Sequence, residues 1–309
     1  MTTRKPNHMT ASKQRRRASQ SGIALILVLW VLTLLSLIVG SFLFMTRGET
    51  RTVIARQDAA KAQALADGGV YWAIAQLLTP VFNEDGVVFA LPVDGRRVSR
   101  TLASGQMVLT IQDVGGLIDV NAADDILLRS LFLSLGRDPE EAAQLADRLI
   151  DFRDLDDRPQ PRGAERADYR ALGLPYGPRN APLLLASEIS QIPGFDRDFV
   201  TRATNYLTAY SGSRAVDPTV APVEILNSIP GLSKVDAEQF IASRRGSSRS
   251  LPHEATNPYL TGSPSSTFRI TVNASTARGS WFQRIAVVQI SGGADRFQIR
   301  HWEQGRITE

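Results

Sequence analysis

The sequence predicts an α+β fold, in which a long N-terminal helix packs on an antiparallel sheet that is interrupted by a large all-α insertion. A charge-free apolar run continues into an alanine-rich segment without proline, which predicts one helix over residues 23–78. Short β-branched segments lie on both sides of a central stretch that is rich in helix-capping signals. We therefore expect a discontinuous sheet domain, residues 79–121 and 266–309, around an inserted helical domain, residues 122–265.

The first half of the predicted helix is expected to span a membrane. Residues 23–45 carry no charge and would extend over roughly 34 Å as a helix, enough to cross a hydrocarbon core of about 30 Å. The leader, residues 1–22, holds six basic residues and no acid, which predicts a cytoplasmic N-terminus and an exported body. A cleavable secretory signal is the alternative, but its apolar run is usually only about 7–15 residues long and ends in a small-residue cleavage site.

Gly22 stands between the basic leader and the apolar run. This arrangement resembles the signal of type IV prepilins, in which a prepilin peptidase cuts after Gly and methylates the new N-terminus, here Ile23. Most proteins of that class carry Glu at the fifth mature position, whereas this chain has Leu27. A carboxylate in apolar surroundings is kept only where it meets a partner, so Leu27 is expected in a first or tip subunit. A plain membrane anchor is the alternative interpretation.

The second half of the predicted helix, residues 46–78, is expected to be periplasmic and ends before Pro80. Apolar or small residues recur there at spacings of three, four and seven and form one stripe: Val53, Ala60, Ala64, Gly68, Trp72, Ala75 and Leu78. The charges do not follow a sustained heptad, which disfavours a coiled-coil stalk. A helix that is half embedded in the membrane and half packed on a domain matches the pilin-like plan.

Strands are expected on both sides of the helical block, over residues 87–91, 97–102, 107–112, 116–121, 268–272, 284–290 and 297–302. The last three segments predict an antiparallel meander, but a small isolated sheet is only marginally stable. We therefore expect them to join the earlier strands. A segment rich in Gly, Ser and Pro, residues 246–266, is expected to be a loop or linker.

Two predicted helices in the central block have clear starting signals. Asp124 is expected to cap the first, and Asp138, followed by Pro139 and two acids, is expected to cap the second.

Further along, two related segments, residues 188–195 and 225–232, each contain an Ile-Pro-Gly turn. A helix is expected after each turn, over residues 196–208 and 233–242 respectively. This pair resembles the helix-hairpin-helix module. The DNA-binding hairpin carries a second Gly where this chain has Asp196 and Ser233, which favours protein packing over phosphate binding. A membrane-tethered DNA-binding protein stays the alternative because Arg244, Arg245 and Arg249 follow.

Composition limits the function classes. Of the 35 basic residues, six lie in the leader, and the other 29 nearly balance the 31 acids, so the basic net charge is weak support for nucleic-acid binding. The chain has no Cys, which excludes disulfides and thiolate chemistry. Its three histidines, His8, His253 and His301, have no evident partners, and no catalytic or phosphate-binding motif occurs. We expect no enzyme.

An acidic segment, residues 151–165, holds four carboxylates within seven positions. Such a group is unfavourable unless water, arginines or a cation compensates it. Calcium suits these ligands because it accepts six to eight oxygens in flexible geometry, although the spacing is not that of an EF-hand. A solvated loop balanced by its own arginines, Arg153, Arg158, Arg162 and Arg166, is the open alternative.

Several motifs in and after this segment resemble the protein K family of the bacterial type II (general) secretion pathway. They are residues 149–157, 163–165, Tyr169, 175–176, 180–183, 187–189 and 192–194. The resemblance implies a minor pseudopilin at the tip of a periplasmic pseudopilus, which nucleates and caps it for export of folded proteins.

The resemblance also implies partners and a metal. The partners would be two other minor pseudopilins in a tip complex, the major pseudopilin, the prepilin peptidase and the inner-membrane secretion platform. The location would be the bacterial inner membrane, with the body in the periplasm. Calcium would lie in the helical domain, and its candidate ligands are Asp154, Asp156, Asp157 and Glu165.

Overall fold

The computed structural model describes residue 2 and residues 21–83, 86–244, 257–263, 265–292 and 296–305. The chain divides into two units, Met1–Gln57 and Asp58–Glu309, and helix α1 (Ser21–Leu77) begins in the first and ends in the second. Within the first unit, the side chains of residues 23–42 are exposed. The part of the chain that the structure describes holds one helix segment long and apolar enough to cross a membrane, Ile23–Phe42.

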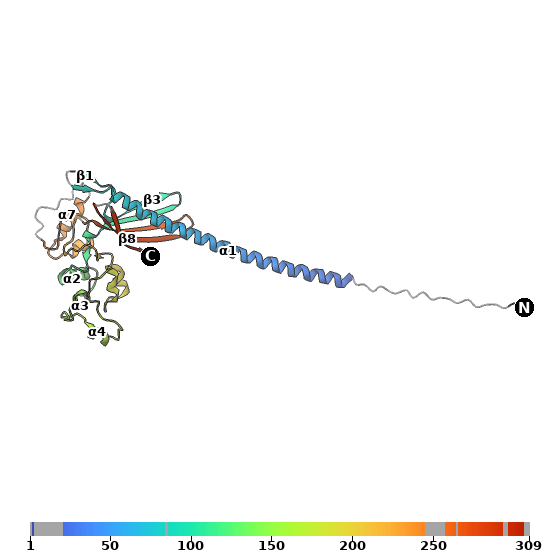
Figure 1. Ribbon diagram of the computed structural model, residues 1–309, viewed down its shortest axis with the longest axis horizontal. Coiled ribbons are helices and arrows are strands. Elements are labelled where there is room, and N and C mark those ends of the chain that lie inside the picture. Colours follow the sequence, from blue (N-terminus) through green and yellow to red (C-terminus); the bar gives the residue numbers. More distant parts are fainter. Residues whose placement is uncertain are drawn as a thin grey trace. The chain divides into compact units, whose positions relative to one another are not determined.

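The second unit is built on a five-stranded antiparallel sheet, with strand order β3-β4-β7-β8-β9 (Figure 1). The strands are β3 (Asp94–Leu102), β4 (Gly105–Asp113), β7 (Thr267–Ser275), β8 (Trp281–Ile290) and β9 (Phe297–Gln304). β4 pairs with β7 from Gln106↔Ser275 to Asp113↔Phe268. The C-terminal strands therefore join the earlier ones, as the sequence predicts, and the helical block is inserted between two neighbouring strands.

The last turns of α1 pack on this sheet mainly through residues outside the predicted stripe, although Trp72 and Leu78 of that stripe are half-buried against the same cluster. The buried side chains are Ala66, Val70, Ala73, Ile74 and Leu77, in one cluster with Leu109, Ile270 and Val272 of the sheet. Ala60, Ala64, Gly68 and Ala75, from the predicted stripe, are exposed instead. The close approach of α1 to β7 selects the face, because a Cβ at Gly69 would lie 2.8 Å from Val272 Cγ1.

Two expected strands differ in the structure. Instead of one strand at residues 87–91, a short hairpin forms from β1 (Val81–Asn83) and β2 (Gly86–Val88). The expected strand at residues 116–121 is replaced by a 3-10 turn, η1 (Val114–Gly116), and the two-residue β5 (Ile118–Asp119). β5 pairs in parallel with β6 (Leu207–Thr208) of the helical block, so it does not extend the main sheet.

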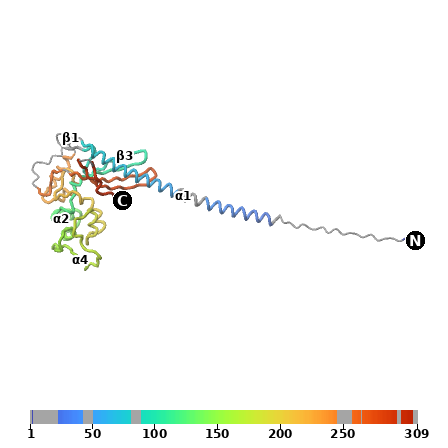
Figure 2. Tube along the Cα trace, viewed as in Figure 1, coloured from blue at the N-terminus to red at the C-terminus, as the bar shows by residue number. Residues whose placement is uncertain are grey.

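The inserted block holds most of the remaining helices, which Figure 2 shows gathered together in green to orange. They are α2 (Asp125–Ser134), α3 (Pro139–Arg153), α4 (Arg166–Ala171), η2 (Ala186–Gln191), α5 (Arg197–Ala203), α6 (Val223–Ser228) and α7 (Lys234–Ser243). Both predicted caps are confirmed: Asp124 accepts from the Leu127 N–H, and Asp138 accepts from the N–H groups of Glu140 and Glu141.

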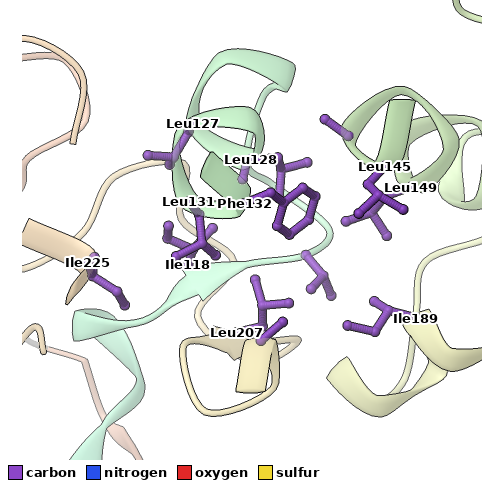
Figure 3. Close-up of a cluster of buried hydrophobic side chains, with 14 of the residues drawn as sticks. Ile118, Leu127, Leu128, Leu131, Phe132, Leu145, Leu149, Ile189, Leu207 and Ile225 are labelled. Atoms are coloured by element: carbon purple, nitrogen blue, oxygen red, sulfur yellow. The ribbon is translucent and has the colours of Figure 1, made fainter. Parts of the chain in front are cut away.

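The block has its own hydrophobic core. Leu128, Leu131 and Phe132 of α2 meet Leu145 and Leu149 of α3, with Ile118, Ile189, Leu207 and Ile225 closing the cluster (Figure 3). The helix expected at residues 196–208 is shorter than predicted. α5 ends at Ala203, because Leu207 is used instead as a buried strand residue beside Ile118.

Candidate cation site in the inserted helical block

Helix α3 anchors the acidic loop through two buried carboxylates one turn apart. Asp151 accepts hydrogen bonds from the N–H of Gln160, at 3.0 Å, and from that of Ala164, at 2.8 Å. Asp147 accepts from the N–H of Arg162 at 3.1 Å. A Cβ at Gly163 would overlap the Asp151 carboxylate, so glycine is required at that point of the loop. Asp151 therefore folds the loop and has little free capacity for a ligand.

Glu165 ends this loop as a buried carboxylate, 5% exposed, immediately before α4. Neither of its carboxylate oxygens accepts a well-aligned hydrogen bond from the described residues. Burial, followed by the neighbouring carboxylates of Asp151, Asp154 and Asp157, raises the pKa of Glu165 to about 7, and the Arg166 N–H offsets this only in part. A buried carboxylate with unused oxygens among other acids is suited to a cation.

Two more oxygens near this point are buried without a hydrogen-bond donor among the described residues: Oδ1 of Asp154 and Oδ1 of Asn180. Burial and the Asp156 carboxylate raise the pKa of Asp154, more than Arg153 lowers it. Asn180 has a φ of 48°, an uncommon left-handed conformation, and its N–H bonds to the Phe152 carbonyl at 3.0 Å. Its side-chain N–H₂ group donates to Asp157 Oδ1 at 3.1 Å, which holds the amide at the acidic loop.

The structure places the four predicted ligands in two settings. Asp154 and Glu165 have buried oxygens to offer, whereas Asp156 and Asp157 lie exposed on the outside of the loop. Asn180 was not among the ligands predicted from the sequence. Its signal was present, because Asn tolerates left-handed backbone and stands before Ala-Pro in a motif of the family resemblance.

The arginines of the loop do not neutralise Asp154 or Glu165 by direct pairing in the described part of the chain. Arg153 donates instead to the carbonyls of Val120 and Ala123, and Arg162 pairs with Glu140 at 2.7 Å. The described residues also contain no group of three or more His, Cys, Asp or Glu side chains arranged to hold a metal. A cation here would therefore depend on amide, carbonyl or water oxygens in addition to the two buried carboxylates.

One carbonyl of each Ile-Pro-Gly hairpin accepts a hydrogen bond from a side chain of the same chain. The Pro193 carbonyl accepts from Arg148 at 2.8 Å, and the Pro230 carbonyl accepts from Asn257 at 2.7 Å. Asp196 caps α5 and forms an ion pair with Arg137. Arg244, a basic residue that had left DNA binding open, donates to two backbone carbonyls, while Arg245 and Arg249 lie outside the described residues.

The predicted processing residues all fall within α1. Gly22 lies in its first turn, and the side chains of Ile23 and Leu27 are 71% and 61% exposed. An apolar helix with no packed face in its own unit is suited to an apolar environment. Together with a helix that packs on an antiparallel sheet, this defines a pilin-like α+β protein.

Comparison with known proteins finds similarity to one family of secretion proteins. Residues 108–212 match the family model for type II secretion system protein K. A relative from Pectobacterium carotovorum subsp. carotovorum named type II secretion system protein K is 26% identical over 212 residues; the match spans 62% of this chain and 64% of that one. A chain in the crystal structure of the GspK-GspI-GspJ complex from enterotoxigenic Escherichia coli superimposes with a TM-score of 0.59 and 18% identity, over 84% of this chain and all of that one. The predicted relationship to type II secretion system protein K is thus confirmed.

Proposed function

We propose that this chain is a minor pseudopilin of the type II secretion system that nucleates and caps the tip of the pseudopilus. The family match across residues 108–212 carries this proposal, because those residues include the start of the helical insertion within a pilin-like frame. The similar chain comes from a complex of GspK with GspI and GspJ, which supports two other minor pseudopilins as partners. Such a role is mechanical and requires no catalysis.

The proposed life cycle begins in the bacterial inner membrane. Residues 1–22 would be the cytoplasmic leader, residues 23–45 the membrane half of the helix and residues 46–78 its periplasmic half. A prepilin peptidase would cut after Gly22 and methylate Ile23. The basic leader and the apolar Ile23–Phe42 segment support this topology.

Two features support the tip position. Leu27 cannot make the carboxylate contact that Glu would offer to a subunit already in place, and a first subunit has no such need. The block is inserted in the chain between β4 and β7, and its bulk would obstruct the addition of a subunit above it.

We propose calcium as the cation of this site, because it accepts carboxylate and amide oxygens in flexible geometry. Asp154, Glu165 and Asn180 would supply two carboxylates and an amide oxygen, and Asp156 and Asp157 could add outer ligands or bound water. The positive charge of the bound ion would neutralise the buried carboxylates. Asp147 and Asp151 would not bind the ion but would hold the loop in place through its backbone N–H groups.

N-terminal sequencing and mass spectrometry of the protein from membranes test the proposal. We expect a chain that begins at methylated Ile23 and co-purifies with other pseudopilins. Gly22→Leu should retain the leader, whereas Gly40→Leu, inside the same apolar run, should be processed normally. An intact leader on the natural chain would favour a plain anchor, and repeated incorporation along a filament shaft would exclude the tip position.

The structure offers no support for the DNA-binding alternative. Asp196 and Arg244 are already engaged within the protein. Salt-dependent DNA binding by the purified chain would reverse this conclusion.

A further inference from the structure

An apolar groove of about 620 Å³ lies on the second unit, between α1 and the β3–β4 hairpin. Its α1 side is formed largely by Ala64, Leu65, Gly68 and Trp72. Ala64 and Gly68 belong to the stripe that the sequence predicts, and both are exposed, so this part of the stripe does not pack on the sheet. The groove is therefore where the apolar stripe of the helix is left open.

Gly68 has no evident purpose inside the chain. A Cβ added there would meet nothing within 4 Å among the described residues, whereas a Cβ on its neighbour Gly69 would press against Val272. Glycine in the middle of a helix is destabilising relative to alanine. The absence of a side chain at Gly68, with the small Ala64 one turn earlier, leaves a shallow surface that lets a second helix approach closely.

The rim of the groove has one sign of charge. Lys61 and Arg100 are the charged residues that line it within the described part of the chain, and no acid does so. Arg100 lies over the Trp72 ring, 5.1 Å from its centroid, which holds its guanidinium at the mouth of the groove. An occupant with an acidic group beside an apolar surface would complement this rim.

We propose that the groove receives a helix from another pilin-like subunit, with small apolar side chains against Gly68 and an acidic side chain between Lys61 and Arg100. The inference rests on the proposed function and adds to it a particular surface and the chemistry of its partner. A helix fits better than a lipid headgroup. The two cations would be enough to bind a headgroup, but the shallow surface of α1 allows the backbone of a second helix to approach closely.

The test uses the full chain, co-produced in membranes with the other pseudopilins of the same bacterium and purified in mild detergent. Gly68→Leu should fill the groove and lower the recovered complex at least tenfold. Ala59→Leu is the matched control: residue 59 is exposed and lies about two and a half turns away, on the opposite side of α1. It should leave recovery unchanged. Circular dichroism should show the same helix content for both variants.

Charge reversal gives a second test that keeps the groove open. Lys61→Glu should lower recovery of the complex, and reversal of one acid in the partner's helix should restore it. Equal recovery for the natural chain, Gly68→Leu and Lys61→Glu would overturn the groove while leaving the proposed function intact. Failure of the natural chain to bind any pseudopilin would overturn both.

A lipid occupant is tested separately with a fluorescent label on Ser104→Cys, since the natural chain has no cysteine. We expect the label to respond to the partner subunit and not to phosphatidylglycerol vesicles alone. A vesicle response that Gly68→Leu abolishes would make the groove a lipid site and would refute the proposal.

Discussion

Replacing Glu165 by Gln should change how the stability of the protein depends on pH. In the folded protein without calcium, the pKa of Glu165 is about 7, whereas its ordinary value is 4.5. Below pH 4.5 the carboxyl is protonated in both folded and unfolded chains and has no effect. Between pH 4.5 and 7 the folded chain keeps a proton that the unfolded chain has lost, so the free energy of unfolding falls as pH rises.

The size of this effect follows from the two pKa values. Their difference corresponds to about 3 kcal/mol of stability lost by pH 8. For a folded unit of this size, each kcal/mol shifts the melting temperature by roughly 2–4 °C, so the expected loss is roughly 6–12 °C. Gln cannot ionise and removes this loss. The melting temperature of Glu165→Gln should therefore exceed that of the natural chain at pH 8. The difference between the two melting temperatures should be larger at pH 8 than at pH 4.5.

Calcium should reverse the order of the two proteins. At a concentration 1,000 times its dissociation constant, a ligand that binds only the folded state adds about 4.1 kcal/mol, which exceeds the loss of about 3 kcal/mol. The natural chain should gain this stability at pH 8, and Glu165→Gln should gain much less. Differential scanning calorimetry of the full chain in detergent, with chelator or with calcium, measures both effects. The exposed Glu238→Gln on α7 serves as control. Parallel pH profiles for the natural chain and Glu165→Gln, with no response to calcium, would refute the reasoning.

Other substitutions test the supports of the fold. Gly163→Ala should clash with a buried carboxylate of α3, destabilise the chain by about 3 kcal/mol and weaken calcium binding, whereas Gly177→Ala makes only ordinary contacts and should be tolerated. Arg269→Met leaves three backbone carbonyls without their charged donor and should cost about 3 kcal/mol or more in urea unfolding. Arg284→Ala removes an ion pair and two ring contacts and should cost about 2 kcal/mol. The corresponding changes at exposed Arg300 should have little effect on unfolding, and equal losses there would contradict these assignments.

Local signals predicted much of the fold because they act within one element. The caps at Asp124 and Asp138 act within two or three residues of the helices they start, so the sequence alone reveals them. The packed face of α1 could not be chosen in this way, since small residues occur on both faces of the helix. Val272, which approaches Gly69, is about 200 positions away in the sequence and decides between the two faces.

The candidate cation site shows the same limit. The cluster of acids was visible in the sequence, but their different tasks depend on the folded loop. The Asp151 carboxylate accepts hydrogen bonds from the N–H groups of Gln160 and Ala164. Asn180 lies outside the loop in the sequence and contacts it through Asp157. Spacing along the chain does not distinguish a carboxylate that binds backbone from one with oxygens left to offer.

The attachment of the inserted block bears on its proposed role as a cap. Polar side chains connect it to the sheet at two places: Gln112, which is buried, donates to the Val220 carbonyl at 2.9 Å, and Arg269, which is half-buried, donates to the Thr204 carbonyl at 3.0 Å. Val220 is itself 2% exposed in the sheet's hydrophobic cluster. A swinging motion of the block would expose that cluster and leave Arg269 and its acceptors unpaired, at a cost of several kcal/mol. A block held in this way can transmit force to the sheet and α1, which a filament tip that pushes on a load requires.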